Sequence, residues 1–241
     1  MSGMSSFVVG AAGAAITGSA AVLARAVRSP SCALLAPSVH RGDAARRAIA
    51  LTFDDGPSES TTELMEILAG YRAPATFFQC GAHVRRLPDI ARQVAAAGHE
   101  IGNHSDTHPM FQFKSREFIY RELAAAQESI EASTGVRPRY FRAPYGIRWF
   151  GLREAQRRLG LMGVMWTVIG LDWKLSAPDV VARMLAGAAN GAILCLHDGR
   201  AGQSRPDLRP TLEAVRQLLP KLMERGFHFE KVTEILCPTK N

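Results

Sequence analysis

The sequence predicts an α/β fold built on a parallel sheet, and three observations support this prediction. From Ala45 onward, short apolar runs typical of buried strands alternate with segments of helical periodicity, in seven successive repeats. Apolar residues make up 47% of the chain and charged residues 21%, which is enough apolar material for a sizeable core. Polar residues of catalytic type follow the apolar runs directly, where parallel α/β folds place their functional sites. Periodicity alone leaves a barrel and a doubly wound layer both open.

The predicted strands share a short apolar run that is closed by glycine, proline or polar residues. They cover residues 48–53, 75–80, 99–103, 139–142, 163–169, 192–196 and 227–232. The helices between them have apolar residues three or four positions apart. They cover residues 64–71, 90–97, 119–130, 152–159, 181–188 and 212–222. Ser60 and Glu63 are expected to form a capping box at the start of the first of these helices.

The N-terminal segment differs from the rest of the chain. Residues 7–24 carry no charge, and this run of 18 residues is near the lower limit for a membrane span. Arg25 and Arg28 follow the run, whereas a secretory signal has its positive charge before it. An anchor, a poor signal peptide, a misplaced start and a packed helix remain as alternatives, and a cell-envelope location is favoured over a cytoplasmic one. Residues 29–43 are interpreted as an aperiodic linker, so residues 1–43 precede one globular domain, 44–241.

The charge and the cysteines exclude some classes of function. The net charge of +7 indicates either a solvated basic surface or attraction to anionic cell-wall polymers or lipid headgroups. No basic run is interleaved with aromatic residues, so a nucleic acid is not an expected partner. The four cysteines form no C-x-x-C pair, so a cysteine zinc site is not indicated.

Two histidines and two carboxylates suggest a metal centre. His104 and His108 lie four residues apart after the third predicted strand, a spacing at which both can reach one ion. Asp54 and Asp55 follow the first strand, and one of them could bind the ion while the other stays free as a general base. Alone, each pair also fits ordinary polar loop residues or a helix cap. Together, two histidines and one aspartate form a ligand set that leaves room for water.

A second group of residues suggests proton transfer. His197 follows a buried apolar run and titrates in the range that suits a general acid, and a carboxylate such as Asp172 could raise its pKa. Arg142 could hold Asp54 ionised, because a guanidinium matches a carboxylate. The backbone N–H of Tyr145, in a Pro-Tyr-Gly turn, could donate to a developing oxyanion. Turn structure, a salt bridge and a satisfied core histidine are the simpler alternatives.

Five motifs that contain these residues follow one another along the chain. They are Thr52-Phe53-Asp54-Asp55-Gly56-Pro57, His104-Ser105-x-x-His108, Arg142-Ala143-Pro144-Tyr145, Asp172-Trp173 and Leu194-x-Leu196-His197-Asp198. In this order they resemble the motifs of NodB-type polysaccharide deacetylases (carbohydrate esterase family four). The resemblance runs from about Ala48 to Asp198, and its first two motifs are highly specific. It implies a distorted (β/α)7 barrel, with residues 44–241 as the catalytic domain.

The resemblance implies a metal-dependent hydrolase that removes N-acetyl groups from amino sugars of a peptidoglycan- or chitin-like glycan. It implies one divalent metal ion, zinc with cobalt or nickel as alternatives, bound by Asp55, His104 and His108. An O-acetyl esterase and a deformylase or deacylase of a lipid-linked sugar are alternatives on the same site. An inactive carbohydrate-binding relative is the alternative from outside the enzymes.

The resemblance also implies roles for the other motif residues. Asp54 would be the base and His197 the acid, with Arg142 tethering Asp54 and Asp172 supporting His197. Tyr145 would help to form the oxyanion hole.

Three more residues, Trp173, Leu196 and Pro144, are expected to contact the substrate, with Trp173 and Leu196 bordering an apolar pocket for the acyl methyl group. One position departs from the family pattern, because many members have an acid three residues before the Asp-Trp pair, where this chain has Ile169.

Overall fold

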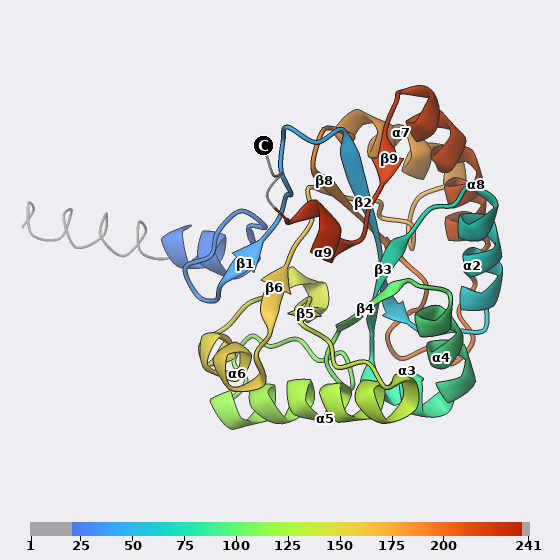
Figure 1. Cartoon of the computed structure of the whole chain (residues 1–241). Coiled ribbons are helices and arrows are strands. Elements are labelled where there is room, and N and C mark those ends of the chain that lie inside the picture. Colours follow the sequence, from blue (N-terminus) through green and yellow to red (C-terminus); the bar gives the residue numbers. More distant parts are fainter. Residues whose placement is uncertain (1–20, 238–241) are drawn as a thin grey trace, which may run out of the picture.

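The computed structural model describes residues 21–237, in which nine strands form one sheet and every strand pair is parallel (Figure 1). The strands are β1 (Ser38–Val39), β2 (Ala48–Gly56), β3 (Ala75–Gln79), β4 (Glu100–Asn103), β5 (Tyr140–Phe141), β6 (Met162–Val164), β7 (Val168–Ile169), β8 (Ala192–His197) and β9 (His228–Phe229). Their order is β1-β6-β5-β4-β3-β2-β8-β7, with β9 beside β2. The sheet is curved like a barrel. It is open, because within the described residues no hydrogen-bonded strand pairing joins β7 to β1.

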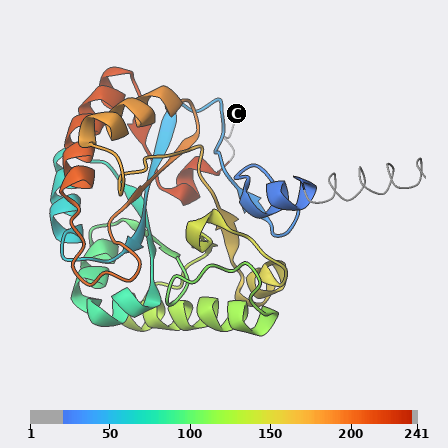
Figure 2. The same cartoon turned by 180° about the vertical axis from the view of Figure 1, so that it is seen from behind.

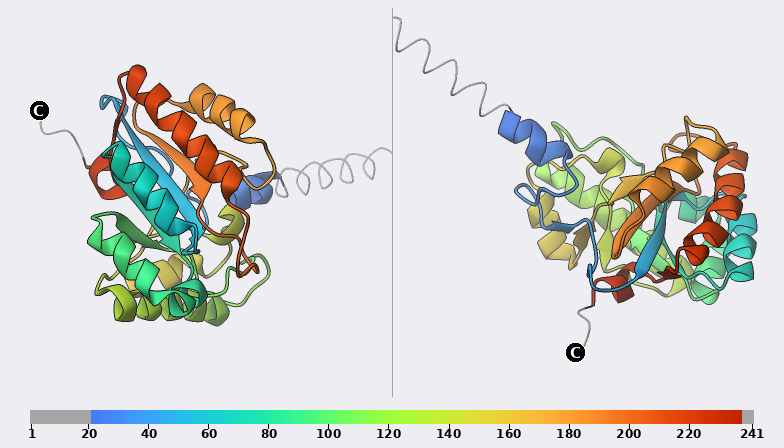
Figure 3. Two further views of the ribbon diagram at one scale, coloured as in Figure 1. Left: turned by 90° about the vertical axis from the view of Figure 1, so that its right-hand side faces the viewer. Right: turned by 90° about the horizontal axis from the view of Figure 1, so that it is seen from above.

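The helices follow the strands, as a parallel sheet requires, because each crossover must return the chain to the starting edge. They are α2 (Thr61–Gly70), α3 (Gly81–Arg86), α4 (Pro88–Ala96), α5 (Arg116–Thr134), α6 (Leu152–Leu159), α7 (Ala177–Gly187), α8 (Arg209–Glu224) and α9 (Val232–Ile235). In Figures 1 and 3 the long helices surround the sheet on the outside, while α9 lies against its inner face. This arrangement confirms the predicted distorted α/β barrel and excludes the doubly wound layer.

The central strand β2 shows why the chain folds in this way. All nine of its residues are buried. Leu51 and Phe53 belong to the large core between the sheet and the outer helices, whereas Ala48 and Ala50 belong to a smaller cluster with Val232 and Ile235 of α9. Successive side chains of a strand point to opposite faces, so a continuous apolar run is what a strand covered on both faces needs.

Three expected elements are shorter or differently divided than the sequence suggests. The fifth predicted strand, 163–169, is broken into β6 and β7, which pair with different neighbours. The seventh, 227–232, is only the two-residue β9, and the chain then turns into α9. Ser60 makes no side-chain cap at α2, so the expected capping box is absent there.

The segment before β2 contains more secondary structure than expected. Residues 29–43, interpreted as an aperiodic linker, contain β1, which pairs with β6. Residues 21–28 are helical, and the backbone N–H of Arg148 donates to the carbonyl of Val27. Figure 2 shows this helix at the side of the barrel that carries β1. Most of residues 7–24 lies outside the described residues, and none of the helices in the described part is both long and apolar enough to cross a membrane.

Candidate active site

A bulge at the end of β2 directs two neighbouring carboxylates to one site. The register of β2 against β3 shifts between Asp54 and Gly56, and Asp55 has a left-handed backbone (φ 68°). In a regular strand, adjacent side chains would face opposite sides of the sheet, and a bulge re-aims one of them. Both carboxylates therefore line the same cavity.

Asp55 meets the two predicted histidine ligands. Its Oδ1 atom lies 3.1 Å from Nε2 of His104 and 3.1 Å from Nε2 of His108, and all three side chains are buried. The loop after β4 is held tight, because the His108 N–H donates to the Ser105 hydroxyl and the Ser105 N–H donates to the Asn103 side-chain oxygen. The three predicted metal ligands, from two separate segments, thus converge on one point.

The position of the proton on His104 leaves this cluster suited to bind a cation. Nδ1 of His104 lies 2.8 Å from the carbonyl oxygen of Arg142, so in the neutral ring Nδ1 carries the proton and Nε2 has the lone pair. That lone pair faces Asp55 Oδ1, a buried atom that no hydrogen-bond donor reaches within the described residues. Burial raises the pKa of Asp55, but when the two rings carry protons toward it, the hydrogen bonds and charges of His104 and His108 outweigh burial and hold this pKa well below its usual range. An ionised oxygen facing an imidazole lone pair needs a positive charge between them, so a divalent cation suits this donor set.

Asp54 is held from behind by a buried arginine. Nη1 of Arg142 donates to Oδ1 of Asp54 at 2.6 Å and to the Thr52 hydroxyl at 2.7 Å. The guanidinium of Arg142 is fully buried and lies 4.2 Å from the ring centroid of Phe78. The Cys195 thiol donates to the other carboxylate oxygen of Asp54, at 3.4 Å. The predicted tether between Arg142 and Asp54 is therefore present as a contact.

His197, which is partly exposed in the cavity, and the buried Asp172 form a second pair. Nδ1 of His197 lies 2.8 Å from Oδ1 of Asp172, whose Oδ2 accepts from the His197 N–H at 3.0 Å and from the Thr211 hydroxyl at 2.6 Å. Burial lowers the pKa of His197, but the hydrogen bond and the negative charge of Asp172 prevail and raise it above its ordinary value. His197 is thereby suited to carry a proton near neutral pH.

These groups line a cavity of about 300 Å³. Its lining residues are Asp54, Asp55, His104, His108, Tyr145, Gly146, Trp166, Ile169, Trp173, His197, Arg200 and Ala201. Tyr145 has a left-handed backbone (φ 57°), and its ring meets that of His108 edge-on at 4.6 Å between centroids. Trp173 meets the ring of His197 in the same way, at 4.8 Å. Ile169, the position that departs from the family pattern, is part of the wall.

Two residues expected to contact substrate do not line this cavity. Leu196 precedes His197 on β8, so its side chain points to the opposite face and joins the core under the outer helices. Pro144 is buried in the turn that presents Tyr145.

Four lining residues, Gly146, Trp166, Arg200 and Ala201, were missed by the sequence analysis. Trp166 lies where the predicted fifth strand breaks, and Gly146 and Arg200 follow the third and fifth motifs. Nη2 of Arg200 lies 3.7 Å from Oδ2 of Asp172. Their positions next to the motifs could have suggested that they belong to the site. The loop geometry, which the sequence does not give, decides which of these side chains point into the cavity.

Comparisons with known proteins agree with this geometry. Residues 41–164 match the family described as Polysaccharide deacetylase. The chain is 34% identical over 198 residues to the chitooligosaccharide deacetylase of Bradyrhizobium sp., covering 78% of this chain and 90% of the relative. It is 32% identical over 201 residues to the peptidoglycan-N-acetylglucosamine deacetylase PgdA of Listeria monocytogenes, covering 83% of this chain and 41% of the relative.

A solved structure is similar over most of the chain. It is a CE4 family pseudoenzyme from Bacillus anthracis, with a TM-score of 0.76 and 28% identity, covering 87% of this chain and 70% of the other. A mutant of that pseudoenzyme with restored activity has the same TM-score. The fold alone thus does not separate active from inactive members. On sequence, fold and site, the chain belongs to the polysaccharide deacetylase family, the NodB-homology hydrolases of carbohydrate esterase family four.

Proposed function

We propose that this deacetylase removes N-acetyl groups from amino sugars of a peptidoglycan- or chitin-like glycan in a metal-dependent reaction. One observation carries the proposal: the Asp55, His104 and His108 ligand atoms converge in the same cavity that Asp54 and His197 line. Hydrolysis of an unactivated amide is helped by a bound metal ion, a general base and a general acid. The three ligands, the carboxylate of Asp54 and the imidazole of His197 would supply these functions.

The metal would be held by Asp55, His104 and His108, with zinc as the proposed ion and cobalt or nickel as alternatives. When bound there, a divalent cation supplies positive charge that polarises a carbonyl group and makes water more acidic. The hydrogen bond from His104 Nδ1 to the Arg142 carbonyl fixes the ring with Nε2 toward Asp55, so that Nε2 would be available to the ion. This set does not include Asp54, whose Oδ1 accepts from Arg142 and whose Oδ2 lies 3.9 Å from Nε2 of His104.

The proton steps follow from the remaining contacts. Asp54, oriented by its hydrogen bond from Arg142, would take a proton from the water that attacks the acetamide carbon. His197, whose pKa is raised by Asp172, gives its proton to the departing sugar amine, which is a poor leaving group without one. The Tyr145 N–H is proposed to donate to the oxyanion at the rim of the cavity. Acetate and a free amino sugar result.

The names of the relatives support the substrate class. The Bradyrhizobium protein is a chitooligosaccharide deacetylase and the Listeria protein a peptidoglycan-N-acetylglucosamine deacetylase, so both names describe the deacetylation of a glycan. A cavity of about 300 Å³ is at the small end for ligand sites, and it suits one acetamide and the sugar ring that carries it. Trp166 and Trp173 supply apolar walls, and Trp173 is half exposed and so available to the substrate.

Acetate release tests the proposal. The protein, stripped of metal and reloaded with zinc, cobalt or nickel, would be offered chitin oligomers, peptidoglycan and acetylated xylan. We expect acetate from the N-acetylated substrates, only with metal, and little from the xylan. Release from xylan alone would favour the O-acetyl esterase, and activity only on a lipid-linked sugar would favour the deformylase or deacylase. A protein that binds no stoichiometric metal and releases no acetate would be an inactive carbohydrate-binding relative.

A further inference from the structure

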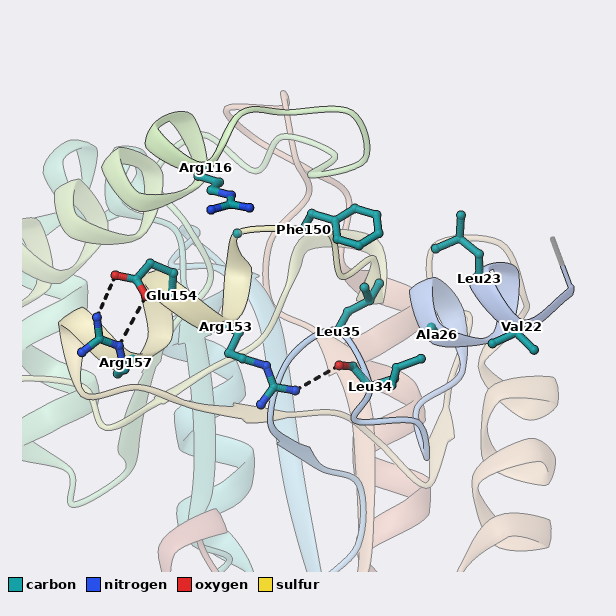
Figure 4. A pocket seen from close by; sticks show the side chains of 11 residues that line it. Val22, Leu23, Ala26, Leu34, Leu35, Arg116, Phe150, Arg153, Glu154 and Arg157 are labelled. Atoms are coloured by element: carbon teal, nitrogen blue, oxygen red, sulfur yellow. Dashed lines mark hydrogen bonds and ion pairs between the residues drawn. The ribbon is translucent and has the colours of Figure 1, made fainter. Parts of the chain in front are cut away.

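A second and larger hollow, which shares no lining residue with the catalytic cavity, has a volume of about 960 Å³. Its walls come from the helix at residues 21–28, the segment at Leu34 and Leu35, the turn at Phe150, and α6 (Figure 4). In Figure 4, Phe150 and Leu35 lie across the hollow from the helix that carries Leu23 and Ala26. We refer to this hollow and its rim as the N-terminal groove.

The N-terminal groove exposes large apolar side chains. Val22 is 59% exposed, Leu34 is 62% exposed and Phe150 is 53% exposed, while Leu23 is 38% exposed. These residues come from the N-terminal segments at Val22 and Leu34 and from the distant turn at Phe150, and all of them line one hollow. A contiguous apolar patch of this kind marks an interaction surface rather than scattered surface residues.

Basic side chains surround the apolar residues. Arg116, Arg153 and Arg157 line the groove, and Arg25 and Arg28 belong to its helix. Glu154 is the one acidic lining residue within the described part of the chain, and it is paired with Arg157 at 2.9 Å. The groove therefore has a net positive charge, which suits a partner that is apolar and anionic at the same time. A second copy of the chain would bring the same arginines against one another, so like charges oppose self-association there.

The sequence of the segment that precedes the groove favours a membrane as the partner. Residues 7–24 carry no charge, and their last members include Val22 and Leu23 of the groove wall. An uncharged run followed by arginines and an apolar face is typical of a segment that meets a bilayer at its headgroups. We propose that the N-terminal groove is a docking face for a membrane with anionic lipids, and that the domain itself contributes to membrane binding through Leu34, Phe150 and the arginines.

Docking at this groove would place the active site close to the membrane. Tyr145 lines the catalytic cavity and Phe150 lines the groove, and Phe150 follows Tyr145 by five positions in the chain. A fully extended chain spans at most about 3.6 Å per residue, so the Cα atoms of these two residues are at most about 18 Å apart. This proposal does not depend on the proposed function, but if both hold, the enzyme acts on glycan at the membrane surface.

Sedimentation with vesicles tests the docking face in the full chain. The vesicles would contain phosphatidylcholine alone or phosphatidylcholine with phosphatidylglycerol. We expect binding to the anionic vesicles, and about tenfold weaker partitioning for Leu34→Ser with Phe150→Ser, because less apolar area is buried. Arg116→Gln with Arg157→Gln should also weaken partitioning by about tenfold, and only on anionic vesicles. Acetate release from a soluble chitin oligomer would be measured for each variant, so that a failure of docking is separated from a failure of catalysis.

The controls lie on other helices and turns of the molecule. Val136→Ser with Met223→Ser removes two exposed apolar residues, and Arg205→Gln with Arg216→Gln removes two exposed arginines that are paired with acids, as Arg157 is. Both control variants should bind as the wild type does. Equal binding of all variants would overturn the proposal and leave residues 7–24 as the sole attachment. A wild-type dimer in solution that Leu34→Ser with Phe150→Ser dissociates, without any vesicle binding, would overturn it in favour of contact between copies.

Discussion

Asp54 and Asp55 are neighbours in the chain, but their surroundings give them different chemistry. Asp54 Oδ1 is bound by Arg142, whereas Asp55 Oδ1 faces two imidazole rings and no donor within the described residues. The bulge in β2 makes this division possible, because it turns Asp55 toward the loop after β4. One carboxylate is therefore available for a cation and the other for a proton.

Replacing Asp54 should separate proton transfer from metal binding. We expect Asp54→Asn to keep stoichiometric metal and to lower kcat by about 10²- to 10⁴-fold, the range for loss of a general base. Metal content would be measured together with acetate release. Cys195→Ala is the matched control, because the thiol is a weak donor to the same carboxylate, and its kcat should stay within about tenfold of wild type. An Asp54→Asn protein of normal activity would rule out the base assignment.

Asp172 should set the alkaline limit of activity. As the proposed acid, His197 works in its protonated form, so activity is lost as the pH rises through its pKa. Burial lowers that pKa, and Asp172 raises it beyond the ordinary value. Asp172→Asn removes the raising charge, so the alkaline limb of the kcat profile should move to lower pH. Thr211→Val, which keeps the Asp172 charge, should move the limb much less. A profile whose alkaline limb is the same in wild type and Asp172→Asn would contradict this role.

Single residues were predictable where a motif fixed them and unpredictable where a loop did. His104, His108 and Asp55 were expected together, and the structure brings them together. Trp166 and Arg200 were missed because no periodicity determines which way a loop side chain turns. The error at Leu196 was avoidable, because a regular pattern does apply there. Successive side chains of a strand alternate between faces, so Leu196, next to His197, must face the core.

The secondary-structure elements were predicted best where they are long and buried. The strands at β2, β3 and β8 were expected close to their observed positions, since each is a continuous apolar run. β1 was missed because two residues in a Pro- and Ser-containing segment show no alternation. The break between β6 and β7 was missed because Met165 and Trp166, two of its three residues, are apolar. In both cases tertiary pairing, rather than local pattern, decides the outcome.

Helix capping offers a test at this scale. Ser115 accepts a hydrogen bond from the Phe118 N–H at the start of α5, whereas Ser60 makes no such bond at α2. We expect Ser115→Ala to lower the free energy of unfolding by about 1 kcal/mol, the usual loss of an N-cap. Ser60→Ala should change it by less than about 0.5 kcal/mol. Urea unfolding of the two variants measures the difference, and an equal loss in both would contradict the observed caps.

At the scale of the whole molecule, the candidate metal centre links segments that are distant in sequence. Asp55 ends β2, while His104 and His108 belong to the loop after β4, and β3 lies between these strands in the sheet. An ion held by all three ligands binds only the folded chain in this geometry. Its binding free energy therefore adds to the stability of the barrel.

Metal binding should consequently raise the melting temperature. With free zinc at about 100 times its Kd, the added stability is about 2.7 kcal/mol, which for a chain of this size corresponds to a shift of roughly 5–10 °C. Thermal unfolding would be followed in EDTA and with zinc. His104→Ala removes a ligand and should lose the shift together with the activity, whereas Asp54→Asn should keep the shift and lose the activity. A shift that survives in His104→Ala would mean that the stabilising ion sits elsewhere, and the proposed ligand set would be wrong.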